Sequence, residues 1–341
     1  MPPLAKRAAA AAACLLAVAA PASGAFAWGA TGHRLIGQLG EAALPADLPA
    51  FLRTPQAVET VGEYAREPDR WRAAGRVHDT ERDPAHFLDL GDDGRIFGGP
   101  ALAALPATRA DYDTALRAVG ADSSKAGYLP YAMIDGWQQL AKDFAYWRIL
   151  TAAIPREKDP ERRAWMQRDL VRREALTLRD VGVWAHYVGD GSQPMHVSVH
   201  YNGWGGFPNP HGYTQDKVHA PFEGAFVRAF VGADQIRAAM APPAPCADPI
   251  EQCVSRYLTT TWSTVEPYYA LQKDGGFAGV DPVRGKAFAA ERLAAAADEL
   301  RDLVTTAWAA SEHGAVGYPP VTVEQVVKGG VDPYDALYGD D

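Results

Sequence analysis

Histidine and carboxylate residues recur four positions apart in two helical stretches of the sequence. His186 and Asp190 bound the stretch "HYVGD", and His219 and Glu223 bound "HAPFE". Residues four apart lie one turn apart on the same helix face. A glycine and a proline after Asp190 interrupt that helix, so we expect His196 to turn back toward the same point. Imidazole nitrogen and carboxylate oxygen together are zinc ligands, whereas calcium takes mostly oxygen. The pattern therefore predicts a zinc site rather than isolated ion pairs at helix ends.

Four short motifs follow one another along the chain. They are "WGATGH" from Trp28, "HFLD" from His86, "HYVGDGSQPMH" from His186 and "HAPFE" from His219. On these motifs, the region from Trp28 to about Ser311 resembles the S1/P1 nuclease and zinc-dependent phospholipase C superfamily. The resemblance implies a mostly helical fold that holds three zinc ions in a cleft. It also implies that a water activated by these ions hydrolyses a phosphodiester.

The resemblance implies a set of metal ligands as well, each at the matching position of a motif. In this family the mature chain begins with a Trp whose α-amino group and carbonyl oxygen bind zinc, and Trp28 matches it. An α-amino group has a pKa of about 8 and so loses its proton readily to a metal. It exists only after the preceding residues are cleaved. The implied set is Trp28, His33, Asp69, His86, His186, Asp190, His196, His219 and Glu223.

The identity of the upstream aspartate is open. The family has an Asp before "HFLD" that binds metal and orients the attacking water. Asp69 in "EPDRWR" matches it best, and Asp79 and Asp83 are the rivals. With Asp69 in this role, Arg72 matches the arginine that holds the scissile phosphate in the nucleases. The resemblance thus implies Asp69 and Arg72 as catalytic residues.

The motifs divide between the two branches of the superfamily. A His only five residues after Trp28, and the gap from His196 to His219, resemble the nucleases. The stretch "QPMH" and the HxxxE pair that ends at Glu223 resemble the phospholipases, but the matching positions hold no aromatic box for choline. We expect a nuclease that cleaves single-stranded nucleic acid, with no stable protein partner. A phospholipase C and a non-catalytic zinc-binding protein are the alternatives, and the choice between DNA and RNA is open.

Candidate substrate contacts lie beside the motifs. Phe87 and Asp89 stand where the nucleases stack on and hydrogen-bond a base, although both also suit packing behind the ligands. The interval from His86 to His186 is longer than either branch has, and the excess falls in 90–150. We expect this insertion to reshape the cleft.

A second rim is expected over 200–213. This glycine-rich stretch offers Trp204, Phe207 and Tyr213 as stacking surfaces. Its histidines, His200 and His211, are expected to be rim or structural residues rather than ligands.

The first residues have the form of an export signal. Two basic residues precede the short apolar run 8–20, and Ala25-Phe26-Ala27 has the A-x-A form that signal peptidase recognises. Cleavage between Ala27 and Trp28 predicts a periplasmic or secreted protein. Cys246 and Cys253 remain in the mature chain, and an exported pair at this spacing predicts a disulfide.

The charge of the chain bears on its substrate. The formal net charge is −9, which disfavours a protein that coats nucleic acid by general electrostatic attraction. It does not exclude an enzyme that brings its own cations, because bound zinc dominates the field at contact distance.

Apolar residues at spacings of three and four predict long helices over 33–44, 127–153, 159–190, 220–230 and 281–311. Strand signals are sparse and no internal boundary is marked. We therefore expect one all-α domain over 28–315, after a signal peptide over 1–27 and before a loosely attached tail over 316–341.

Overall fold

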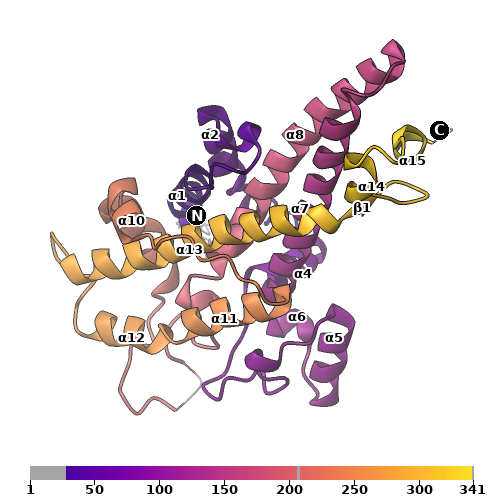
Figure 1. The fold of residues 1–341 in the computed structure, drawn as a ribbon. Helices are drawn as coiled ribbons and strands as arrows, with labels where there is room; N and C mark the ends of the chain where they lie inside the picture. The colour runs from indigo at the N-terminus through magenta and orange to yellow at the C-terminus, as the bar shows by residue number, and fades with distance from the viewer. Residues whose placement is uncertain (1–27, 206–207, 340–341) are drawn as a thin grey trace, which may run out of the picture.

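The structure is a computed structural model that describes residues 28–205 and 208–339. The predicted signal peptide and Phe207 lie outside the described residues. The described chain is mostly helical, which confirms the expected all-α class. Figure 1 shows two long helices, α7 (Leu129–Ala153) and α8 (Pro160–Asp190), rising side by side, with α13 (Val283–Ala310) crossing them.

The other helices are shorter and surround these three. They are Gly29–Ala42 (α1), Pro55–Tyr64 (α2), Glu67–Arg70 (α3), Arg76–Arg82 (α4), Arg109–Ala118 (α5), Ser123–Ala126 (α6), Val227–Phe230 (α9), Ala233–Ala239 (α10), Ile250–Trp262 (α11), Val265–Lys273 (α12), Val323–Val327 (α14) and Tyr334–Tyr338 (α15). Single 3₁₀ turns cover Ala50–Arg53 (η1), Asp83–His86 (η2), Leu102–Ala104 (η3), Pro194–His196 (η4) and Ser311–His313 (η6). A π-helical turn covers Pro221–Phe226 (η5). Two short antiparallel strands pair Ala315–Val316 (β1) with Val321–Thr322 (β2).

Local signals set the limits of α8, the helix that carries the central motif. The Asp159 side chain caps its first turn by accepting hydrogen bonds from the backbone N–H groups of Glu161 and Arg162. Pro160 suits the first position because its missing N–H is not needed there. The helix ends at Asp190, as predicted, and Gly191 and Pro194 then lead into η4.

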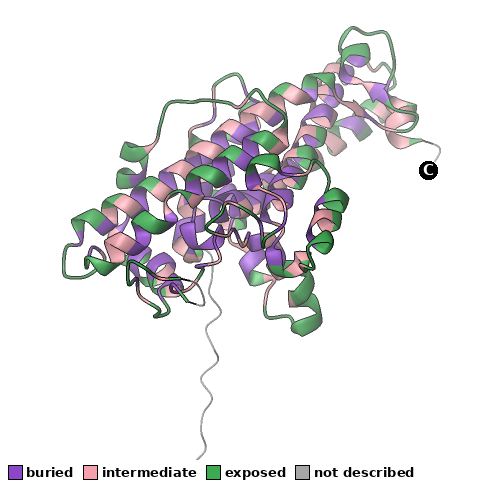
Figure 2. Ribbon diagram, turned by 90° about the horizontal axis from the view of Figure 1, so that it is seen from below, coloured by how far each residue is buried: buried purple, intermediate pink, exposed green. Residues whose placement is uncertain are grey.

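The apolar faces of the long helices form the core. One cluster gathers residues of α7, α8, α11 and α13, and a second gathers residues of α1, η5, α12 and α13. In Figure 2 the buried segments lie at the centre of the molecule, and the exposed segments form its outer faces and ends. Among the described residues, no helix combines the length and the apolar character needed to cross a membrane.

The last residues differ from the loosely attached tail that the sequence suggests. Val316, Val321, Val323 and Val326 are buried, and they pack with Ile149 and its neighbours in a third core cluster. Figure 1 accordingly shows α14 and α15 beside the outer ends of α7 and α8. These valines are spaced through short strands and a five-residue helix, so no long periodic pattern announces them.

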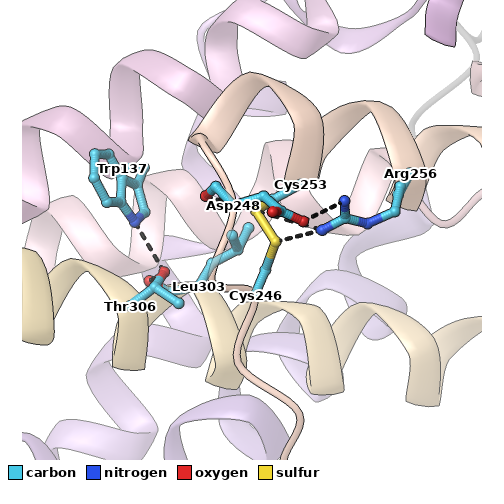
Figure 3. Close-up of a disulfide and its surroundings, with 7 residues drawn as sticks. All are labelled: Trp137, Cys246, Asp248, Cys253, Arg256, Leu303 and Thr306. Carbon is cyan, nitrogen blue, oxygen red and sulfur yellow. Dashed lines mark hydrogen bonds and ion pairs between the residues drawn. A yellow bond between two sulfur atoms is a disulfide. The ribbon is translucent and has the colours of Figure 1, made fainter.

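The predicted disulfide is present between Cys246 and Cys253, whose Cα atoms lie 6.0 Å apart. It joins the loop before α11 to the first turns of that helix (Figure 3). Arg256 donates hydrogen bonds to the Cys246 sulfur and to the Asp248 carboxylate. Disulfides of this kind persist in oxidising compartments.

Candidate metal centre

Histidine and carboxylate side chains from six elements gather in three groups that could each hold a metal ion. Within each group the ligand atoms all lie within 4.8 Å of one another. The groups are His33, His186 and Asp190; Asp69, His86 and His186; and His196, His219 and Glu223. Every implied side-chain ligand thus falls in a group, and Trp28 is the one member of the implied set outside them.

Asp190 and His186 join the first two groups. Oδ1 of Asp190 lies 3.5 Å from Nε2 of His33, and its Oδ2 lies 3.1 Å from Nδ1 of His86. Nε2 of His186 lies 3.0 Å from Nδ1 of His86 and 3.9 Å from Oδ1 of Asp69. One carboxylate therefore faces both groups, which suits a ligand that bridges two metal ions.

The third group lies where η4 meets the π-helical turn. Nε2 of His219 lies 2.7 Å from Oε2 of Glu223, and Nε2 of His196 lies 3.8 Å from the same oxygen. Gln193 donates a hydrogen bond of 3.2 Å to this oxygen. Such π turns are rare and occur often at functional sites.

Second partners orient the imidazole rings. Nδ1 of His186 lies 2.8 Å from the carbonyl oxygen of Ala65, and Nδ1 of His196 lies 2.5 Å from that of His86. A ring that donates through Nδ1 presents the lone pair of Nε2, which is the atom that faces the other ligands here. At Gly189 a Cβ would lie 3.1 Å from Nδ1 of His33, so the absence of a side chain there leaves room for that ring.

Burial shifts the protonation of these groups in the metal-free chain. Burial lowers the pKa of His186 to about 3 and the pKa of His86 well below its usual value. Burial also raises the pKa of Asp190 well above its usual value, and the negative charges of Asp69 and Glu223 add to this rise. Burial alone would raise the pKa of Glu223, but His219 and His196 together hold it below its usual value.

These observations fit bound cations. Oδ1 of Asp190, Oε1 of Glu223 and Nε2 of His196 are buried and lack a hydrogen-bond partner within the described residues. Buried polar atoms without partners are costly, and a cation with several ligands relieves that cost. The mixed nitrogen and oxygen donor set suits zinc better than calcium or magnesium.

Trp28 lies close to the groups. Its side chain is fully buried, and its indole N–H donates to the carbonyl oxygen of Gly189 at 2.8 Å and to the Ser192 hydroxyl at 2.9 Å. A Cβ at the next residue, Gly29, would lie 3.1 Å from the carbonyl oxygen of Glu223. The start of α1 therefore packs between the end of α8 and η5, beside residues of two ligand groups.

The structure distinguishes Asp69 from its two rivals as a candidate metal ligand. Asp69, on α3, belongs to a ligand group, whereas Asp79 and Asp83 belong to none within the described residues. Asp83 instead accepts a hydrogen bond of 2.9 Å from Nε of Arg72. Nη1 of Arg72 lies 3.4 Å from Oδ1 of Asp69, so this arginine reaches the edge of the ligand cluster.

A cleft of about 760 Å³ opens beside the ligand groups. His86, His196 and His219 line it, and so do Phe87 and Asp89, the two candidate substrate contacts. Burial raises the pKa of Asp89 to about 7. These three histidines, Arg72 and the two candidate substrate contacts therefore line one space.

The rim differs in part from the expectation. Trp204 and Tyr213 are buried in the core rather than exposed for stacking, and Trp204 stacks on the ring of His200 with centroids 3.6 Å apart. His200 is also buried and lies 2.9 Å from Asp92, while His211 is exposed beside Glu266. Both histidines are outside the ligand groups, in agreement with a structural role.

Sequence reasoning missed several residues that line the cleft. They include Arg76, Ser124 and Lys125, whereas Tyr201, which also lines the cleft, falls within the expected rim 200–213. Ser124 and Lys125 belong to the 90–150 insertion, so that part of the chain does contribute to the cleft. No spacing in the sequence links them to "HFLD", because the contact depends on how the loop between them folds back.

Comparison of the chain with protein-family models, with curated proteins and with solved structures finds no match in any of the three.

Proposed function

We propose that this chain is an exported zinc-dependent phosphodiesterase of the S1/P1 nuclease type that hydrolyses single-stranded nucleic acid. The observation that carries the proposal is that two of the three ligand groups open onto one cleft, and the third group shares His186 with one of them. His86, His196 and His219 each belong to a group and also line the cleft, which Arg72 lines as well. Metal ligands and an arginine therefore face the same space, as phosphate hydrolysis requires.

The residues of the chain have distinct parts in this proposal. Bound zinc would supply a Lewis acid and lower the pKa of a water toward about 7. Asp69 is suited to orient that water and to accept its proton at a carboxylate oxygen, since it lies in a ligand group and next to Arg72. Arg72 is held through Nε by Asp83, which fixes its guanidinium at the cleft to receive a phosphate oxygen.

The whole-chain charge of −9 does not oppose an anionic substrate. Distant acids are screened over a Debye length of about 8 Å at physiological salt. Within the cleft, Arg72, Arg76 and Lys125 add positive charge to that of the metal ions. Asp79, Asp83 and Asp89 line the same cleft, so the formal charges of its side chains balance and a positive field there depends on the metal ions.

Export is supported by the disulfide Cys246–Cys253, together with the sequence of the first 27 residues. Removal of the export signal would leave the α-amino group of Trp28 free.

The test uses the purified mature protein that starts at Trp28. We expect it to hydrolyse single-stranded DNA and RNA, to lose that activity with a chelator and to regain it with added zinc. Phosphatidylcholine vesicles under the same conditions should be cleaved far more slowly.

Two outcomes would overturn the proposal in different ways. Fast hydrolysis of phosphatidylcholine with inert nucleic acid would make the protein a phospholipase C. Stoichiometric zinc with no turnover on either substrate would make it a non-catalytic zinc-binding protein.

A further inference from the structure

The 90–150 insertion forms one wall of the cleft and is fastened to the "HFLD" motif through backbone hydrogen bonds. The N–H of Tyr128 donates to the carbonyl oxygen of Pro84 at 2.5 Å, and the N–H of Asp89 donates to that of Ala126 at 2.8 Å. These bonds run in both directions between two segments about 40 residues apart. They hold α6 (Ser123–Ala126) in place beside the motif.

Gly127 makes this close approach possible. Its φ is 93°, a region that side chains disfavour, and a Cβ there would lie 2.0 Å from the carbonyl oxygen of Phe87. The hydroxyl of the buried Tyr112 donates to the Gly127 carbonyl oxygen at 2.7 Å and fixes the same point from α5. The wall is therefore a built part of the cleft rather than a surface loop that happens to lie near it.

Two further cations line the cleft, where the charge of Lys125 also acts on Asp122. Arg72 is engaged by Asp83 and Asp69. In contrast, no hydrogen bond or ion pair within the described residues holds the side chain of Arg76, on α4, or of Lys125, on α6. Both side chains are exposed, and exposed cations in a concave site attract anions because the field is focused there.

We propose that Arg76 and Lys125 bind a second phosphate of the substrate, the neighbour of the one held at Arg72. This inference rests on the proposed function and names its substrate class further: a strand with at least two successive phosphodiesters. Phosphatidylcholine has only one phosphate, so the same two cations would favour nucleic acid over phospholipid. Each contact is a charge-assisted hydrogen bond to phosphate, and so acts mainly on binding.

The experiment removes one charge from the substrate and one from the protein. The substrates are the thymidine trinucleotide d(TpTpT) and its two isomers in which one linkage is a neutral methylphosphonate. The proteins are the wild type, Lys125→Ala and Arg76→Ala. Exposed residues elsewhere on the surface give the matched controls Lys158→Ala and Arg53→Ala.

In the wild type, neutralising the linkage next to the one that is cleaved should raise KM by roughly 3- to 10-fold with little change in kcat. In Lys125→Ala and in Arg76→Ala this penalty should become smaller, because one of the two charged partners of the second phosphate is gone. The controls should keep the full penalty. Binding of 3′-fluorescein-labelled trinucleotides, followed by fluorescence anisotropy with chelator present, should give the same pattern in Kd.

The two proposals fail in distinguishable ways. If the trinucleotide is cleaved and the methylphosphonate penalty is equal in all five proteins, the second phosphate contact is wrong while the nuclease stands. If no protein cleaves any trinucleotide, the nuclease is wrong. The anisotropy measurements then decide the second phosphate contact by themselves, because equal Kd values for charged and neutral linkages would exclude it.

Discussion

At the scale of single residues, Asp190 connects the first two ligand groups. It is fully buried, and its two oxygens face His33 on one side and His86 on the other. Glu223, by contrast, lies beside the two histidines of its own group and accepts a hydrogen bond from Gln193. Loss of the Asp190 carboxylate should therefore release more metal ions per chain than loss of the Glu223 carboxylate.

Asp190→Asn should lose about two zinc ions per chain, and Glu223→Gln about one, because an amide is a weak zinc ligand. Elemental analysis of the purified proteins measures this. Asp143→Asn is the control, since Asp143 is a buried acid outside the ligand groups. Equal losses in the Asp190 and Glu223 variants would contradict the bridging position of Asp190.

Arg72 should affect rate more than metal content. Arg72→Ala should lower kcat/KM on single-stranded DNA by about 10²-fold if the guanidinium acts on charge that develops at phosphorus. Arg72→Lys should recover only part of this, because lysine lacks the planar fork. Steady-state kinetics with Arg53→Ala as the control tests it, and an unchanged kcat/KM in Arg72→Ala would remove this arginine from the mechanism.

Glu41 is a buried acid that belongs to none of the ligand groups found among the described residues. Its side chain is fully buried on α1, both carboxylate oxygens lack a hydrogen-bond partner among the described residues, and burial raises its pKa to about 8 from 4.5. Because the unfolded chain ionises Glu41 more readily than the folded chain does, the folded state is increasingly disfavoured as pH rises from 4.5 to about 8. The free energy of unfolding should fall through that interval on account of Glu41.

Glu41→Gln removes the titration and keeps the shape. Its free energy of unfolding should exceed that of the wild type by on the order of 2 kcal/mol at pH 8, and the difference should shrink toward pH 4.5. Urea unfolding across this range measures the difference. The exposed Glu59 gives the control Glu59→Gln, which should follow the wild type at every pH.

At the scale of elements, the start of α1 is held by contacts with both α8 and η5. Trp28 is buried with a left-handed φ of 31°, and its indole is tied to Gly189 at the end of α8. Gly29 packs against the backbone of Glu223 and Gly224.

A protein with one extra Met before Trp28 should bind less zinc than the signal-cleaved form and turn over nucleic acid much more slowly. The amine would become an amide nitrogen, which is a poor zinc donor. Circular dichroism should still report a helical fold, since most of the implied ligands lie elsewhere in the chain. Equal zinc content and equal turnover in the two forms would show that the cut end is not a ligand.

At the scale of the whole molecule, the ligand groups couple metal to stability. They connect α1, α3, η2, α8, η4 and the segment around η5, which span most of the chain. Without cations, Asp69, Asp190 and Glu223 share one buried region, and burial raises the pKa of Asp69 to about 7. Because these elements come from distant parts of the chain, bound metal should stabilise the whole folded state rather than one element.

Chelation should lower Tm by on the order of 10 °C at pH 8. The drop should be smaller at pH 5, because protons compete with metal for the same ligands and because neutral carboxyls repel each other less. Calorimetry with and without chelator at the two pH values tests this. A drop that is equal at both values would indicate that the metal does not occupy these groups.

The sequence by itself determined what depends on neighbouring residues. The i, i+4 spacing of His186 with Asp190, and of His219 with Glu223, brings each pair into one ligand group because the helical repeat alone sets it. Cap and break signals near Asp159 and Gly191 predicted α8 to within a residue. The disulfide followed from two cysteines at a short separation.

Only the tertiary structure decided what depends on distant segments. It brought Asp69 rather than Asp79 into a ligand group, buried Trp204, and packed the last valines against α7. It also set Lys125 beside "HFLD" through backbone hydrogen bonds and Gly127. These outcomes share one physical reason: burial and contact depend on which remote surface covers a residue, and local spacing carries no record of that surface.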